Sequence, residues 1–251
     1  MNTTLSDRLG IQSYCFRAFK TLPDLIQALK DTGLNRLELW GGHLDGFDPE
    51  KADIPAALEA FHREQVIITT CGVYGFDTDE TAARRAFDFA KAAGFPTISG
   101  DLRTDEALPL VERLCEEYGV RVAIHNHGKK HRLGSPEALA DLFGRSSDRI
   151  GLCLDTAWML DSGEDPVAIA RRFRDRLYGL HLKDFEFDAE GNHRDVIVGQ
   201  GGLDLPALIR LLVETGYDGY LTQEFEGNPE DPVPSCRECV AAIRRTIGEV
   251  V

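Results

Sequence analysis

Positive charge is scarce in this 251-residue chain, whose 28 basic side chains are outnumbered by 42 acidic ones. The formal net charge of −14 at pH 7 produces a field that repels phosphate backbones and anionic membrane surfaces. We therefore expect neither a nucleic acid nor a membrane as a partner.

Long apolar runs are also missing. No segment approaches the roughly 18 consecutive apolar residues that cross a bilayer. The opening residues, MNTTLSDRLG, lack the basic flank and the apolar stretch of a signal peptide. These features predict a cytoplasmic protein, and they leave homo-oligomerisation open.

A disulfide framework is absent as well. Six cysteines are scattered over a mid-sized chain, which favours buried free thiols over cross-links. Only Cys236 and Cys239 have CxxC spacing, and one such pair supplies at most half of a zinc site. We interpret this pair as part of a helix.

Strand-like and helix-like segments alternate along the whole chain. The predicted strands are 10–14, 36–40, 66–71, 97–99, 120–125, 150–155, 177–182 and 220–225. The predicted helices are 22–32, 50–64, 79–93, 105–118, 135–143, 165–175, 204–215 and 235–249, several of them with proline near the first turn. Eight such units pair their strands in parallel and predict a (β/α)₈ TIM barrel in which residues 1–251 form a single domain.

Two glycine-related observations bear on competing interpretations. A doubly wound open sheet normally has a glycine-rich phosphate turn after its first strand, and the segment IQSYCFRAF has none. A later segment, VGQGGLDLP, precedes a helix and resembles an anion-binding turn. Isolated glycine-rich turns are weak evidence, so we interpret this one as a tight loop.

Four of the predicted strands end in an imidazole or a carboxylate. Such groups are costly to bury without a partner, and a cation shared between them removes that cost. Imidazole nitrogen and carboxylate oxygen suit Mn²⁺, Zn²⁺, Co²⁺ or Fe²⁺, whereas the lack of a thiolate argues against a structural zinc site. The predicted ligands of one divalent ion, with Mn²⁺ preferred and Mg²⁺ also open, are His125, Asp155, His181 and Glu224.

The segment AIHNHG places two histidines, His125 and His127, on one side of a strand, because side chains two positions apart share a face. Both are expected to face the barrel mouth, where active sites of such barrels lie. One is expected on the metal and the other beside it, and the spacing alone does not distinguish them.

Seven segments resemble those of the sugar phosphate isomerase/epimerase superfamily, the xylose-isomerase-like TIM barrels: GIQSYCFRAF, RLELWGGHL, AIHNHG, IGLCLDTAWMLDSGEDP, LHLKDF, VGQGGLDLPALI and LTQEFEGNPEDP. The resemblance extends from the first predicted strand to the last predicted helix. In that family one divalent cation binds neighbouring oxygens of a keto sugar or polyol. The resemblance therefore implies a metal-binding role for Asp155, His181 and Glu224.

Two positions depart from the family pattern. Many relatives have a glutamate at the end of the fifth strand, where this chain has His125. We assign His125 to the metal because it matches that glutamate, and the reverse assignment, with His127 on the metal, stays open. Relatives often read Asp-Thr-Gly-His after the sixth strand, but here Trp158 stands at the fourth position and is expected either to stack on a sugar ring or to close the mouth.

The resemblance implies an isomerase or epimerase that abstracts a proton next to a carbonyl, through an enediolate stabilised by the metal. A neutral imidazole suits this task near pH 7, so His127 is the candidate base. Glu224 or Glu38 is the candidate opposing acid or base.

Further residues are expected around a sugar substrate. Lys183 is expected to contact a substrate oxygen, or else to pair with Asp184 or Glu226. His131 is expected on the loop surface. Arg17 is alternatively suited to bind a phosphate group on the substrate. The acidic composition of the chain favours an unphosphorylated sugar. The candidate contacts to sugar hydroxyls are Tyr14, Arg17, His43 and Cys71.

Three other functions stay open. Histidine in place of the family glutamate leaves room for elimination, by a dehydratase or by a lyase that opens a 3-keto-glycoside. A second alternative is a non-catalytic barrel that only binds sugar. The third is an apurinic-site endonuclease, which shares this barrel but needs a multi-metal cluster and a basic groove that the acidic composition does not provide.

Overall fold

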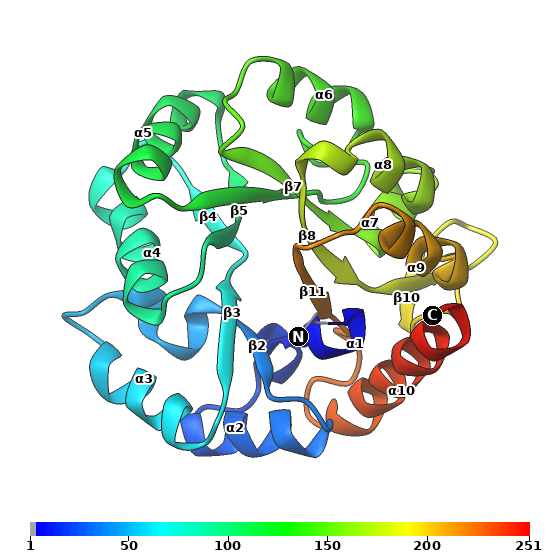
Figure 1. The fold of residues 1–251 in the computed structure, drawn as a ribbon, viewed down its shortest axis with the longest axis horizontal. Helices are drawn as coiled ribbons and strands as arrows, with labels where there is room; N and C mark the ends of the chain where they lie inside the picture. Colours follow the sequence, from blue (N-terminus) through cyan, green and yellow to red (C-terminus); the bar gives the residue numbers. More distant parts are fainter. Residues whose placement is uncertain (1–3) are drawn as a thin grey trace.

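The chain forms a ring of parallel strands enclosed by helices (Figure 1). The structure is a computed structural model and describes residues 4–251. Nine strands pair in parallel in the order β3-β2-β1-β11-β8-β7-β6-β5-β4. Their bounds are β1 Leu9–Gln12, β2 Arg36–Leu39, β3 Ile67–Cys71, β4 Tyr74–Phe76, β5 Thr97–Leu102, β6 Arg121–His125, β7 Ile150–Asp155, β8 Leu177–Leu182 and β11 Tyr220–Gln223. The predicted (β/α)₈ TIM barrel is confirmed.

The third barrel strand is interrupted, which explains why nine strands fill eight positions. β3 pairs with β2, whereas β4, which follows after Gly72 and Val73, pairs with β5. A Cβ atom on Gly72 would lie 2.3 Å from the carbonyl oxygen of Ser99. The break therefore needs glycine, because the backbone passes so close to β5.

Most helices connect the strands and cover the outside of the ring, whereas α1 precedes the first strand and is drawn within the ring in this view (Figure 1). Their bounds are α1 Leu5–Arg8, α2 Leu22–Asp31, α3 Ile54–Arg63, α4 Glu80–Ala93, α5 Leu108–Tyr118, α6 Pro136–Gly144, α7 Thr156–Asp161, α8 Pro166–Arg172, α9 Leu205–Glu214 and α10 Val233–Val250. Helices α2, α6, α8 and α9 have proline in the first turn, and the residues whose side chains cap them are Thr21, Ser135, Asp165 and Asp204. These starts agree with the proline positions read from the sequence.

The cysteine prediction is confirmed in the described residues. All six cysteines are free and buried, and Cys236 and Cys239 lie inside α10. Among the helices of residues 4–251, none has the length and apolar character needed to cross a membrane.

Two elements were absent from the sequence prediction. An antiparallel hairpin, β9 Asp184–Phe187 and β10 His193–Val196, follows the seventh barrel strand. The short helix α7 begins directly after β7, at Thr156. Both lie on the side of the barrel where the strands end, and both contribute to the site described below.

The segment VGQGGLDLP is a tight loop around an internal anion. The carboxylate of Asp184 accepts hydrogen bonds from the backbone N–H groups of Gly199, Gly201 and Leu203, at 2.9, 2.9 and 3.0 Å. These amides are therefore occupied by the protein's own carboxylate, which supports the tight-loop interpretation over the phosphate turn.

Candidate metal centre

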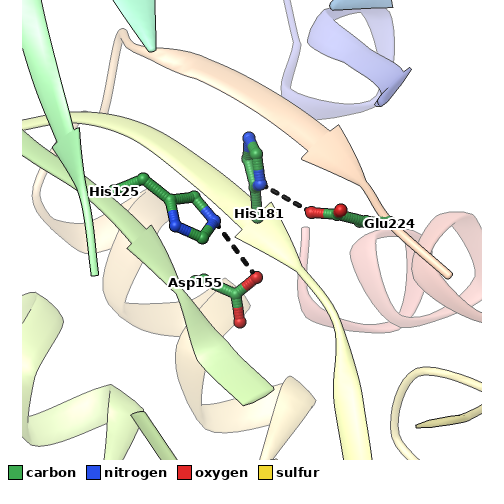
Figure 2. A group of neighbouring side chains, drawn as sticks. All are labelled: His125, Asp155, His181 and Glu224. Atoms are coloured by element: carbon green, nitrogen blue, oxygen red, sulfur yellow. Dashed lines mark hydrogen bonds and ion pairs between the residues drawn. The ribbon is translucent and has the colours of Figure 1, made fainter. Parts of the chain in front are cut away.

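Four side chains from four neighbouring strands meet at one point (Figure 2). His125 ends β6, Asp155 ends β7, His181 lies near the end of β8, and Glu224 directly follows β11. Asp155 and His181 are register partners across β7 and β8. One ligand atom of each of the four lies within 4.8 Å of the others, and all four residues are buried. The predicted ligand set is thus brought together by the barrel.

The two oxygens of Asp155 have different surroundings. Oδ1 accepts a hydrogen bond of 2.8 Å from the Trp158 N–H and so caps α7. Oδ2 lies 3.4 Å from Nε2 of His125 and is buried without a hydrogen-bond partner in the described chain. The carboxylate is therefore oriented by the helix start, with one oxygen left for the centre.

Asn126 fixes the backbone of Asp155. Its side-chain amide donates to the Asp155 carbonyl oxygen at 3.0 Å, and its oxygen accepts from the Asp155 N–H at 2.9 Å. Asn126 is fully buried between the ends of β6 and β7. The sequence prediction missed this role, although the residue stands between the two histidines of HNH.

The imidazole of His181 is bound at both nitrogens by carboxylates. Nδ1 lies 2.7 Å from Oε2 of Glu224, and Nε2 lies 2.8 Å from Oε2 of Glu38. Glu38 is fully buried at the end of β2. A carboxylate behind a histidine ligand holds the ring in one orientation and increases its basicity.

Burial and neighbouring charges set the protonation of these groups. Burial and the nearby His181 lower the pKa of His125 to about 3, so its imidazole is neutral near pH 7. Burial raises the pKa of Asp155 to about 6. Burial alone would raise the pKa of Glu224 too, but Lys183 and His181 hold it below its usual value. A neutral imidazole with two carboxylates is the protonation state in which these side chains bind a cation.

Three buried polar atoms in this region have no hydrogen-bond partner in residues 4–251: Nδ1 of His125, Oδ2 of Asp155 and Oε1 of Glu38. Buried polar atoms are nearly always paired, so unpaired ones grouped beside these side chains are compatible with a bound ion. Two imidazoles and two carboxylates are also the donor types that divalent transition-metal ions accept. The residues present therefore fit the divalent ion implied by the sequence.

Lys183 is buried beside the four candidate ligand residues. Its ammonium group pairs with Glu226 and lies 3.8 Å from Asp195. Burial lowers the pKa of Lys183, but Glu224, Asp155 and Glu226 more than offset this, so the side chain remains charged. Of the two ion pairs considered from the sequence, the structure contains the one with Glu226, because Asp184 is bound to the loop amides.

A cleft of about 970 Å³ opens next to the ligand residues. His127 lines it, and the centroid of its ring lies 4.7 Å from that of His125. Burial and the neighbouring His125 lower the pKa of His127 to about 4. The structure therefore groups His125 with Asp155, His181 and Glu224, and places His127 between this group and the cleft.

An aromatic wall forms one side of the cleft, where Trp158 and His193 line it and Phe185 is buried beside them. Trp158 on α7 meets the rings of Phe185 and His193 at centroid distances of 5.2 and 5.0 Å, and Phe185 stacks on His193 at 4.1 Å. The last two residues belong to the β9–β10 hairpin. Trp158 is thus the one predicted substrate contact that lines the cleft, and the hairpin residues beside it were missed.

The other four predicted substrate contacts lie elsewhere around the mouth. The Arg17 guanidinium donates to the carbonyl oxygens of Tyr14 and Glu226, at 3.1 and 2.7 Å. Nε2 of His43 lies 3.0 Å from the carbonyl oxygen of Ser13. Cys71 is fully buried, and burial raises the pKa of its thiol well above the usual value. Among the described residues that line the cleft, none of Tyr14, Arg17, His43 and Cys71 occurs.

His131 was expected on the loop surface, and it lies in the loop that follows β6, where it is partly exposed. The side chain is only 27% exposed, and its Nε2 lies 3.4 Å from Oδ2 of Asp101. Asp101, on β5, was missed entirely. Together with His127 these residues form a second group of metal-ligand types, with one ligand atom of each within 4.8 Å of the others. The loop that follows β6 brings His131 close to Asp101, and no spacing in the sequence predicts this proximity.

Known proteins resemble this chain in sequence and in fold. The sequence profile of the xylose isomerase-like TIM barrel family matches residues 103–245. The chain is 31% identical over 139 residues to the rhizopine catabolism protein MocC of Rhizobium meliloti. The matched segment covers 50% of this chain and 42% of that protein. The chain is 28% identical over 141 residues to an inosose dehydratase of Lacticaseibacillus casei, which covers 49% and 47%.

Among solved structures, that of the IolI protein with a binding zinc atom has a TM-score of 0.72 and 16% identity, and covers 97% of this chain and 98% of that one. This likeness shows the fold. The chain spans about half the length of the curated relatives named above. The family profile, however, matches more than half of the 251 residues. The chain therefore belongs to the xylose isomerase-like TIM barrel family.

Proposed function

We propose that His125, Asp155, His181 and Glu224 hold one divalent cation, and that the chain removes a proton next to the carbonyl of a keto sugar or keto polyol. The convergence of these four buried side chains supports the metal site. When bound, the cation supplies Lewis acidity for the charge that develops on the substrate oxygens. Mn²⁺ and Zn²⁺ both suit the donor set, and the zinc named for IolI supports the second.

His127 is the proposed base, and its position carries the proposal. It is the imidazole that lies against the ligand residues while also lining the cleft. The low pKa produced by burial and by His125 keeps the ring neutral, so a nitrogen lone pair is available to accept the proton. Lys183 remains a buried cation beside the centre, where it is suited to donate a hydrogen bond to a substrate oxygen.

Glu38 is a positioning residue in this proposal. Its Oε2 lies 2.8 Å from Nε2 of His181 and, unlike His127, it is not among the residues that line the cleft. This leaves His127 without Glu38 as the opposing base that a two-base epimerase would use. A single imidazole is sufficient for elimination: it accepts the proton from carbon, the bond from the neighbouring carbon to its hydroxyl oxygen breaks, and the same proton leaves with that oxygen as water.

We therefore place a dehydratase first, on an unphosphorylated keto polyol or keto sugar. The inosose dehydratase among the relatives supports this choice. The second candidate is an isomerase or epimerase, in which the proton returns to a carbon. Glu224 favours this candidate, because it is a carboxylate in the centre that follows β11, whereas His127 follows β6.

The test uses the metal-loaded protein and a panel of inososes and keto sugars in D₂O, with products identified by NMR. Loss of water from a substrate supports the dehydratase, whereas deuterium in an epimer or isomer supports the second candidate. His127→Ala is expected to reduce turnover about 10²- to 10⁴-fold. The matched control His62→Ala, at an exposed position on α3, should retain it. Full turnover by His127→Ala would remove the base assignment.

A further inference from the structure

A second cluster of possible ligands lies in the cleft, beside the four residues described above. Asp101 projects from β5, and His127 and His131 follow β6. One ligand atom of each lies within 4.8 Å of the others. All three residues are partly exposed and line the cleft, so an ion from solvent reaches them directly.

The contacts within the cluster leave coordination capacity unused. Oδ2 of Asp101 faces Nε2 of His131 at 3.4 Å, while Oδ1 of Asp101 is buried without a partner in the described residues. The rings of His127 and His131 lie 4.6 Å apart between centroids. An ion pair between Asp101 and His131 does not account for the unpaired Oδ1 of Asp101 or for the His127 imidazole beside it.

We propose that Asp101, His127 and His131 form a second divalent-cation site, suited to Zn²⁺. Two imidazoles and one carboxylate, with the fourth position open to the cleft, make up a zinc-binding set of the exchangeable kind. The Asp101 carboxylate supplies one negative charge to a bound cation. The net charge of −14 on the whole chain also favours cation binding. Any ion held here occupies a lone pair of His127.

The hydrogen bonds of His131 define what binding changes. The Leu133 N–H donates to Nδ1 of His131 at 3.2 Å, so the proton of the neutral ring is on Nε2, facing Asp101. A cation at Nε2 displaces this proton, and the ring then holds it on Nδ1. The Leu133 hydrogen bond is broken in the process, which gives the Leu133 amide an NMR signal that reports loading of this site alone.

Occupation of the second site has a functional consequence that rests on the proposed role of His127. A base whose lone pair is bound to a metal no longer accepts a proton. The first equivalent of Zn²⁺ therefore activates and the second inhibits. The binding itself is independent of the reaction, so the metal stoichiometry tests the site even if no substrate is found.

The experiment is a Zn²⁺ titration of chelator-treated protein, followed by calorimetry and by metal analysis after gel filtration. The wild type and His62→Ala are expected to bind two equivalents. His131→Ala and Asp101→Asn are expected to bind one, and Asp155→Asn is expected to lose the other. Circular dichroism establishes that each variant is folded. If His131→Ala does not fold, the conservative variant Asp101→Asn tests the second site in its place. In the wild type the Leu133 amide shifts with the second equivalent.

A wild type that binds one equivalent would overturn the second site, as would a second equivalent that persists in both His131→Ala and Asp101→Asn. The failure of the proposed function is a separate outcome: no turnover at any Zn²⁺ concentration, with two equivalents bound. The inhibition is measured within each variant, as the ratio of activity at one and at two equivalents. We expect this ratio to fall to about one in His131→Ala.

Discussion

The imidazole of His181 lies between two carboxylates, with Nδ1 2.7 Å from Glu224 and Nε2 2.8 Å from Glu38. The two contacts serve different purposes in the proposed centre. Glu224 belongs to the four residues whose ligand atoms converge, whereas Glu38 lies on the opposite side of the ring. The orientation of one proposed metal ligand thus depends on a residue from β2, on another part of the barrel.

Glu38→Gln tests this dependence. The amide still accepts a hydrogen bond from Nε2 of His181 but removes the negative charge behind the ring. We expect the affinity of the first metal ion to fall by about tenfold to 100-fold, because partners behind metal ligands have effects of this size. Competition with a chromophoric chelator measures the change. Glu116→Gln, on the exposed face of α5, is the matched control, and equal affinities in the two variants would exclude the positioning role.

Asn126→Ala tests how the position of Asp155 is fixed. The substitution removes hydrogen bonds of 3.0 and 2.9 Å and leaves the Asp155 N–H and carbonyl without these partners in a buried region. We expect the free energy of unfolding to decrease by about 2–4 kcal/mol, from the cost of buried polar groups that lose their partner. Urea denaturation measures the loss. Asn126→Asp retains the acceptor for the Asp155 N–H and should recover part of it; a neutral effect of Asn126→Ala would contradict the assignment.

Asp184→Asn tests the loop that follows β10. One amide oxygen replaces two carboxylate oxygens, so the three N–H donors of Gly199, Gly201 and Leu203 no longer all find an acceptor. We expect a loss of about 1–3 kcal/mol in the free energy of unfolding. Protease sensitivity of residues 199–203 is expected to rise in parallel. Unchanged proteolysis would show that the loop is held by other contacts.

Trp158→Ala tests the aromatic wall of the cleft. The indole meets Phe185 and His193 edge-on and presents a large apolar surface to a bound ring. Loss of about 1 kcal/mol of aromatic contact corresponds to roughly a fivefold rise in KM. Trp158→Phe keeps part of the apolar surface, so its KM should lie between that of the wild type and that of Trp158→Ala. A change confined to kcat would place Trp158 in the chemistry instead of in substrate binding.

Much of the barrel could be predicted from the sequence because its signals are local. The alternation of apolar runs with helical periodicity located the eight strand positions, and proline near helix starts located several helices. The hairpin β9–β10 was missed because the alternation of β9, Asp184–Phe187, spans only four residues, and β10, His193–Val196, is mostly charged and has no apolar alternation. The break at Gly72 depends on the approach of Ser99, a contact between two strands.

The site shows the same division between local and long-range information. His125, Asp155, His181 and Glu224 stand at strand ends, and the geometry of a parallel barrel brings strand ends together. Asp101 and His131 escaped prediction because their proximity is created by the path of a loop. Glu38 was assigned to acid–base chemistry from its strand position, whereas its contact with Nε2 of His181 depends on the distance between β2 and β8.

The β9–β10 hairpin supplies the turn residues Glu190, Gly191 and Asn192, together with His193, to the cleft, while the four converging ligand residues come from the barrel strands or directly follow them. In the proposed function, the residues that hold the cation and the hairpin residues that line the cleft therefore come from different segments of the chain. Substitutions in the hairpin turn are expected to change which substrate is accepted, while the four converging side chains stay in place.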